Sequence, residues 1–319
     1  MTAKKRWLAG LGLLAVLLAG ILAYPFVAGD METLALDDAA RATIKDRSFV
    51  RLTDGYTCYQ MAGPEDGQPV VLVHGMTGPS FIWDHQFDAL AQAGFRVLRY
   101  DLYGRGYSDR PACRYDENLF DRQLLELLDT LGITRPADVV GLSMGGAVTV
   151  RFLDRHPERV RRFALFAPSG FPVHVPLKYA AMHWPGVGEW MMKAVGDRYL
   201  ASGVARRMRL TPVQKQVFEA LYVDQMRYRG HKRALLSTLR HTPLLTLESV
   251  YESAGKKGRK GMLFWGTADH VIPFEHHKLV QAAMPGVEFH ALEGWGHTVN
   301  YENPEAVNAP LIAFLKRAE

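Results

Sequence analysis

The sequence predicts an α/β fold: a mostly parallel central sheet with helices on both faces and an inserted helical cap. Two observations predict it. Short, almost continuously apolar runs alternate with amphipathic helical patterns, and one long stretch interrupts this alternation with helices alone. A chain of 319 residues with 48% apolar and 22% charged residues is long enough to bury a sizeable core.

The first segment predicts a membrane span or a signal peptide. Basic residues at positions 4–6 precede an uncharged run of 23 residues, from Trp7 to Gly29, which can cross a hydrocarbon core of roughly 30 Å at about 1.5 Å per residue. The basic side is expected to stay cytoplasmic, which places the rest of the chain across the membrane, in the periplasm if the source is bacterial. The alternative is a secretory signal peptide cut near "FVAGD", which releases the protein.

The rest of the chain divides into three parts. A polar, Ala-rich helical linker is expected over 30–48, a core over 49–170 and 258–319, and a helical cap over 171–257. Strands are expected at 55–63, 68–75, 95–101, 137–143, 160–170, 261–269 and 287–297. Helices are expected between them at 84–93, 119–131, 147–156, 275–283 and 304–317.

Composition excludes some classes of function. The net charge of +5 is too small to indicate nucleic-acid binding. The cap carries 14 Lys or Arg against 6 Asp or Glu, which fits either a solvated surface or contact with anionic lipid headgroups. Cys58 and Cys113 are too few for a disulfide framework or a dedicated zinc site. The sequence leaves open whether Cys58 and Cys113 form a disulfide bond. We expect two free thiols.

The segment "VVGLSMGGAV" predicts a nucleophile. Gly141, Ser143 and Gly145 form a G-x-S-x-G pattern between an apolar strand and a helix, the context in which a sharp turn exposes a serine hydroxyl. That hydroxyl needs a base to take its proton and donors to hold the oxyanion that forms. The N–H of Met144, at the start of the helix, is the first expected donor.

The segment "VLVHGMTG" is expected to supply the second donor, the N–H of Met76. Gly75 lets this loop approach the substrate closely, and His74 is expected to be structural. The base and its acid are expected later in the chain: Asp269 in "FWGTADHVIP" and His297 in "EGWGHTVNYENPE". Both follow strands, at the same sheet edge as Ser143.

Five motifs in this order resemble the α/β-hydrolase fold family, specifically its capped members: "HGMTG", "YDLYGRGYSDRP", "GLSMGG", "WGTADHVIP" and "GWGHTVNYENPE". The resemblance covers about residues 50–318 and implies a structural role for Asp101. Relatives with an aspartate nucleophile are excluded because Ser143 stands at that position. The classes of relative that the resemblance still allows are esterases, monoacylglycerol-lipase-like enzymes, carbon–carbon hydrolases of ring-cleavage products, and perhydrolases.

The expected function is hydrolysis of small-molecule or lipid carboxylic esters, including monoacylglycerol-type esters, by Ser143, His297 and Asp269 through an acyl-enzyme. No cofactor or metal is expected. Trp184 and Trp190 of the cap are expected to contact substrate together with Gly75. A carbon–carbon hydrolase, a perhydrolase and a non-catalytic binding module are the alternatives, and the oligomeric state stays open.

Overall fold

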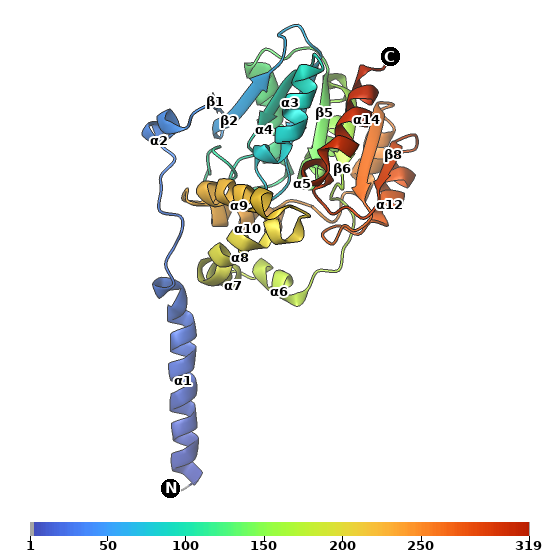
Figure 1. Cartoon of the computed structure of the whole chain (residues 1–319). Helices are drawn as coiled ribbons and strands as arrows, with labels where there is room; N and C mark the ends of the chain where they lie inside the picture. Colours follow the sequence, from blue (N-terminus) through green and yellow to red (C-terminus); the bar gives the residue numbers. More distant parts are fainter. Residues whose placement is uncertain (1–2, 319) are drawn as a thin grey trace.

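The computed structural model describes residues 3–318 and has the α/β architecture that the sequence predicts (Figure 1). One eight-stranded sheet is formed by β1 Ser48–Leu52, β2 Gly55–Ala62, β3 Pro69–Val73, β4 Arg96–Tyr100, β5 Ala137–Leu142, β6 Val160–Phe166, β7 Lys260–Gly266 and β8 Glu288–Leu292. The strand order is β1-β2-β4-β3-β5-β6-β7-β8. The β1–β2 and β2–β4 pairs are antiparallel, and all pairs from β4 to β8 are parallel.

Helices cover both faces of the sheet and bury an apolar core on each. One core is enclosed by α4 Glu117–Thr130, α5 Met144–Arg155, α11 Glu248–Gly255 and α12 His276–Ala283. The other is enclosed by α3 Asp84–Gln92, α13 Val299–Glu302 and α14 Pro304–Lys316, with the short turn η1 Ser80–Trp83 packed among them. A second short turn, η2 Pro157–Arg159, joins α5 to β6. Strand β3 is buried along its whole length, which explains its unbroken apolar sequence.

The described residues between β6 and β7 form helices and no strand, as the sequence predicts. These helices are α6 Leu177–Ala180, η3 Ala181–His183, α7 Val187–Met191, η4 Met192–Gly196, α8 Asp197–Gly203, η5 Ala205–Arg207, α9 Pro212–Met226 and α10 His231–His241, followed by α11. The cap rests on the loop after β4, where the Tyr107 hydroxyl donates to Asp224 at 2.7 Å. Helix α11 packs against α5 in the main body, so we propose that the cap ends before Glu248.

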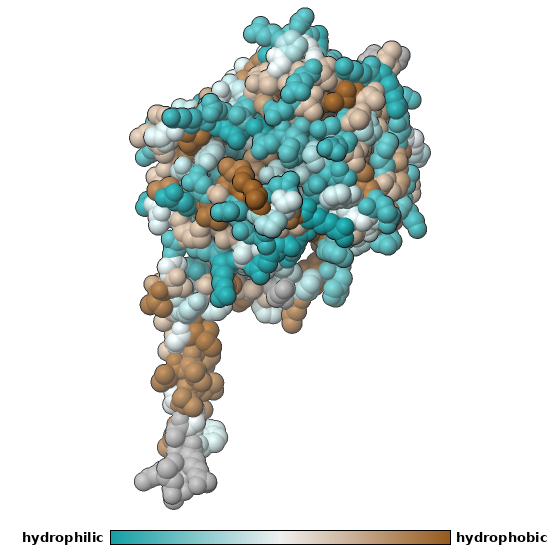
Figure 2. All heavy atoms as spheres, viewed as in Figure 1, coloured by the Kyte–Doolittle hydropathy of each residue, from teal (hydrophilic) through white to brown (hydrophobic). Residues whose placement is uncertain are grey.

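Helix α1 Ala3–Val27 projects from this body, and Figure 2 shows the part of it nearer the body as a hydrophobic column below a mostly hydrophilic surface. Its Gly10–Val27 segment is long and apolar enough to cross a membrane and is almost entirely exposed, which fits an anchor or a signal sequence.

The segment after α1 is not the continuous helix that we expected. Only α2 Asp38–Thr43 is helical, capped by the Asp37 carboxylate, which accepts from the Ala40 N–H. The residues before it lie against the cap, where the Leu34 N–H donates to the Arg227 carbonyl at 2.9 Å. Ser48, the last residue of the expected linker, is the first residue of strand β1. This strand escaped detection because only one of its five residues is buried, and its pairing with β2 is what forms it.

Candidate active site

Ser143 stands in a strained turn between β5 and α5. Its backbone has φ 55° and ψ −117°, a region that side-chain-bearing residues rarely adopt. A Cβ on Gly141 would lie 2.3 Å from the Gly145 carbonyl oxygen, and one on Gly145 would lie 2.1 Å from the Val73 carbonyl oxygen. The two glycines therefore permit the close approach that this turn requires, and Ser143 remains partly exposed.

Asp269 and His297 meet although 28 residues separate them. Asp269 follows β7 and His297 follows β8, and the His297 Nδ1 lies 2.7 Å from the Asp269 Oδ2. The other oxygen of Asp269, Oδ1, accepts from the N–H groups of Val271 at 2.7 Å and Ile272 at 3.0 Å. This carboxylate is fully buried, whereas the His297 side chain keeps 13% of its surface exposed. The imidazole is thus oriented through Nδ1, which directs Nε2 away from Asp269.

The surroundings of Asp269 favour its ionised form. Burial acts to raise the pKa of this carboxyl group, but the charge and hydrogen bond of His297 and the two backbone N–H groups lower it. The net result is a pKa below the ordinary value of an aspartate. Asp269 therefore remains an anion beside the imidazole at neutral pH.

The loop after β3 lies beside Ser143. A Cβ placed on Gly75 would lie 3.4 Å from the Ser143 Cβ and 3.9 Å from its Oγ. Met76 follows in this loop, and Met144 is the first residue of α5. The first N–H groups of a helix have no acceptor within the helix and can bind an anion. We therefore propose the N–H groups of Met76 and Met144 as the donors to one oxygen.

His74 and Asp101 hold loops in place. The Leu102 N–H donates to His74 Nε2 at 2.9 Å, and complete burial lowers the pKa of His74 to about 4, so the ring is neutral. The Asp101 carboxylate accepts from the N–H groups of Ser80 and Tyr107, both at 2.9 Å. These contacts agree with the structural roles expected for both residues.

Two residues near this site escaped the sequence reasoning. Arg105 donates through Nε to the Met76 carbonyl at 3.0 Å, and Glu302 accepts from the Thr298 N–H at 3.1 Å and its hydroxyl at 2.7 Å. Both side chains are buried, which is unusual for Arg and Glu. Arg105 lies in the motif "YGRGYSD" and Glu302 in the motif "HTVNYENPE", so the motifs could have indicated both residues. Neither motif shows which group the side chain binds.

The structure places the two expected cap contacts on the outside of the cap. Trp184 is 61% exposed, and the Trp190 indole N–H donates to the Ile21 carbonyl of α1 at 3.1 Å. Both positions favour contact with α1 or its surroundings over contact with a substrate at Ser143. We therefore leave these two residues out of the proposed site.

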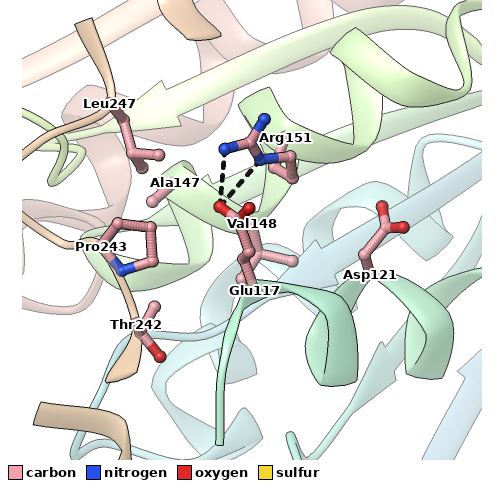
Figure 3. A pocket seen from close by; sticks show the side chains of 8 residues that line it. All are labelled: Glu117, Asp121, Ala147, Val148, Arg151, Thr242, Pro243 and Leu247. Atoms are coloured by element: carbon pink, nitrogen blue, oxygen red, sulfur yellow. Dashed lines mark hydrogen bonds and ion pairs between the residues drawn. The ribbon is translucent and has the colours of Figure 1, made fainter. Parts of the chain in front are cut away.

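A small pocket between α4 and α5 is separate from this site (Figure 3). It is lined by Glu117, Asp121, Ala147, Val148, Arg151, Thr242, Pro243 and Leu247. The Arg151 guanidinium faces the Glu117 carboxylate across it, with a shortest distance of 2.6 Å. Ser143, Asp269 and His297 do not line this pocket, so we assign it no part in the proposed chemistry.

No group of three or more His, Cys, Asp or Glu side chains in the described part of the chain is placed to hold a metal ion. Cys58 is buried, Cys113 is exposed, and the two are unpaired.

A family model for the alpha/beta hydrolase fold matches residues 68–304, which is more than half of the chain. The chain belongs to the alpha/beta hydrolase fold family. Among curated relatives, a 2-hydroxy-6-oxononadienedioate/2-hydroxy-6-oxononatrienedioate hydrolase from Comamonas testosteroni is 24% identical over 78% of this chain and 88% of its own length.

Solved structures of other family members share this fold. A thermophilic esterase from Thermogutta terrifontis superposes with a TM-score of 0.72 and 22% identity, covering 85% of this chain and 98% of the esterase. A membrane phospholipase A described as a bacterial virulence factor superposes with a TM-score of 0.69 and 21% identity, covering 98% of both chains. These likenesses show the hydrolase fold and leave the substrate open.

Proposed function

We propose that this alpha/beta hydrolase is a serine hydrolase that cleaves carboxylic esters, in particular lipid-like or monoacylglycerol-type esters. The observation that carries the proposal is the 2.7 Å contact between His297 and a buried Asp269, at the sheet edge where Ser143 stands in a strained turn. An imidazole oriented by a carboxylate is the base that a serine nucleophile needs.

The proposed reaction has two halves. Ser143 Oγ attacks the ester carbonyl while His297 takes its proton, and the N–H groups of Met76 and Met144 stabilise the oxyanion. The C–O bond to the alcohol then breaks, and the alcohol leaves with the proton from His297. In the second half, His297 takes a proton from water while the water oxygen attacks the acyl carbon. The bond between that carbon and Ser143 Oγ then breaks, Oγ takes the proton back from His297, and the acid is released. Asp269 holds the imidazole in the required tautomer throughout.

Hydrolysis of a carbon–carbon bond is the second candidate. The relative from Comamonas testosteroni is named for a 2-hydroxy-6-oxononadienedioate substrate, which supports this alternative. Such a substrate is a soluble dicarboxylate, whereas a chain with an apolar N-terminal helix suits a substrate from the membrane. We therefore favour esters.

A substrate panel tests the proposal. The purified chain is offered p-nitrophenyl esters of increasing acyl length, monoacylglycerols and 2-hydroxy-6-oxononadienedioate. We expect ester turnover that Ser143→Ala removes and that Asp269→Asn lowers by up to about 10⁴-fold, because the amide no longer orients the imidazole. Turnover of the dienedioate alone favours the second candidate, and full activity of a folded Ser143→Ala variant refutes both.

We also propose that α1 remains attached as a membrane anchor, with the body on the non-cytoplasmic side. Support comes from the length of its apolar segment and the basic residues before it. The mass of the protein extracted from cell membranes tests this, because cleavage near Gly29 removes the whole helix. Recovery of only the shorter form identifies α1 as a signal peptide.

A further inference from the structure

Proline 25 leaves one carbonyl of α1 without its helical donor, and the cap supplies a replacement. Pro25 lies inside α1 and has no N–H for the carbonyl four residues earlier, that of Ile21. The Trp190 indole Nε1–H donates to this carbonyl at 3.1 Å. Pro25 is buried, whereas its neighbours Tyr24 and Phe26 are exposed. The cap therefore contacts α1 at the position where the helix lacks a hydrogen bond.

The position of this contact along α1 sets how close the cap comes to a membrane. A hydrocarbon core of roughly 30 Å spans about 20 residues of helix, which reaches from Trp7 to Phe26. The Ile21 carbonyl then lies about 7 Å inside the core boundary, at about 1.5 Å per residue. The Lys193 Nζ lies 4.2 Å from the centre of the Phe26 ring, at that boundary. Trp190 can therefore reach the Ile21 carbonyl only if the surface of the cap around it lies in the headgroup layer.

The cap surface next to this contact has the composition of a membrane interface. Figure 1 shows α6, α7 and α8 at the end of the body from which α1 projects. The exposed apolar and aromatic side chains of this region come from α6, α7, α8, η4 and the bend before α7. We call them the membrane-proximal cap face: Leu177, Trp184, Val187, Val195 and Tyr199. Exposed basic residues flank it: Lys193, Arg198, Arg206 and Arg207. Trp, Tyr and basic residues are enriched where proteins meet headgroups, and basic residues attract anionic lipids.

A second attachment fixes the cap relative to the end of α1. The Glu32 carboxylate accepts from the Gly230 N–H at 2.7 Å and the Lys232 N–H at 2.5 Å, at the start of α10. The Lys232 Nζ also pairs with the Asp30 carboxylate at 2.8 Å. Because Asp30 and Glu32 follow α1 closely, the body is not free to swing away from the helix.

We propose that the membrane-proximal cap face lies in the headgroup layer of the bilayer that α1 spans, held there by the Trp190–Ile21 hydrogen bond. This inference rests on the anchor proposed above and does not depend on the ester chemistry. Its consequence is that a lipid substrate passes from the bilayer to the cap without crossing water.

Spin labels on single cysteines test the position of this face. The full chain is reconstituted in phosphatidylcholine vesicles with and without phosphatidylglycerol. The native protein, whose exposed thiol is Cys113, provides the water-facing reference. Leu177→Cys and Val195→Cys, each with Cys113→Ser, carry the label on the cap face.

We expect both cap labels to collide more with oxygen and less with a water-soluble nickel chelate than the Cys113 label does. Equal accessibility of the three labels to the chelate overturns the proposal. If the chelate reaches the cap labels once the protein is diluted with lipid, a second copy of the chain covered this face. That result also overturns the proposal. Activity on a soluble p-nitrophenyl ester is measured on the same samples, so that loss of the chemistry is distinguished from loss of docking.

A double-mutant cycle tests the hydrogen bond itself. Trp190→Phe removes the donor and keeps an aromatic ring, Trp184→Phe is the matched control, and Pro25→Ala returns a helical donor to Ile21. We expect Trp190→Phe to shift the docked population by about 2- to 10-fold, as one hydrogen bond does. We expect Trp190→Phe to shift the docked population less when Pro25→Ala is also present. In that chain the Ile21 carbonyl already accepts a hydrogen bond from residue 25. Equal effects of the two tryptophan variants, or no influence of residue 25, contradict the proposed role of Trp190.

Discussion

The guanidinium of Arg105 joins the loop that carries Met76 to the cap. Its Nε donates to the Met76 carbonyl at 3.0 Å, and its Nη2 donates to the Thr238 hydroxyl of α10 at 2.8 Å. The side chain is fully buried, and none of the ion pairs among residues 3–318 includes it. Burial lowers the pKa of Arg105 to about 10, so the group stays charged at neutral pH. A buried cation therefore fixes the backbone beside the proposed oxyanion donor.

We predict that Arg105→Lys lowers kcat on a p-nitrophenyl ester by about 10-fold and changes KM less. The reason is that a lysine cannot hold Met76 and Thr238 together, and a lost oxyanion donor costs about 10²- to 10³-fold. Arg110→Lys is the matched control, because Arg110 lies in the same loop, is partly buried and donates to the carbonyls of Ser108, Gly106 and Gln225. Equal losses of kcat in the two variants, in step with their melting temperatures, indicate a purely structural role for Arg105.

Glu302 is expected to support the loop that carries His297. Its buried carboxylate accepts from Thr298 and also from the Arg209 N–H of the cap at 3.1 Å. We predict that Glu302→Gln lowers kcat by about 10-fold, less than the 10²-fold that a 1 Å displacement of a reacting group costs. The exposed Glu305, three residues further along in α14, provides the control, and Glu305→Gln is expected to leave kcat unchanged. Stopped-flow or steady-state hydrolysis of a soluble ester measures both, and a wild-type kcat for Glu302→Gln refutes this role.

Stability is predicted to fall as the pH drops below about 6.5. Burial lowers the pKa of His74 to about 4 and, with the charges of Arg110 and Arg105, that of His231 to about 3. The unfolded chain binds protons at these positions near pH 6.5, so stability present above that pH is lost as the pH falls toward the folded values. The expected slope is up to about 1.4 kcal/mol per pH unit for each histidine.

The histidine prediction is checked by urea unfolding at pH 7 and pH 5. His231→Phe removes one titrating group and is expected to reduce the difference in unfolding free energy between the two pH values. His85→Phe, at an exposed position, is the control and is expected to keep the full difference. If His231→Phe leaves the difference in unfolding free energy between pH 7 and pH 5 unchanged, the fold does not keep the His231 ring neutral.

The turn at Ser143 is predicted to tolerate no side chain at residue 145. A Cβ there would lie 2.1 Å from the Val73 carbonyl oxygen and 2.5 Å from that of His74, so the central strand has to move. We expect Gly145→Ala to cost about 1–3 kcal/mol or more in unfolding free energy. Gly203→Ala, with open space around it at the end of α8, is expected to stabilise by about 0.4–1 kcal/mol. Differential scanning calorimetry compares the two, and a stable Gly145→Ala variant contradicts the described turn.

The sequence by itself determined the α/β class, the order of the main elements and the segments that carry Ser143, Asp269 and His297. It could do so because apolar periodicity and the Gly141–Ser143–Gly145 spacing are local: each depends on residues within one strand, turn or helix. Strand β1 and the non-helical linker were missed because partners far along the chain form them: β2 for the strand, the cap for the linker.

Only the tertiary structure decided which side chains meet. It brought Asp269 to His297, supplied Arg105 as the donor to Met76, and paired the carbonyl freed by Pro25 with Trp190. A sequence reveals that Pro25 leaves a carbonyl without a donor, or that a buried Arg needs acceptors. It does not reveal the partner, because hydrogen bonds between distant segments depend on packing that no local pattern encodes.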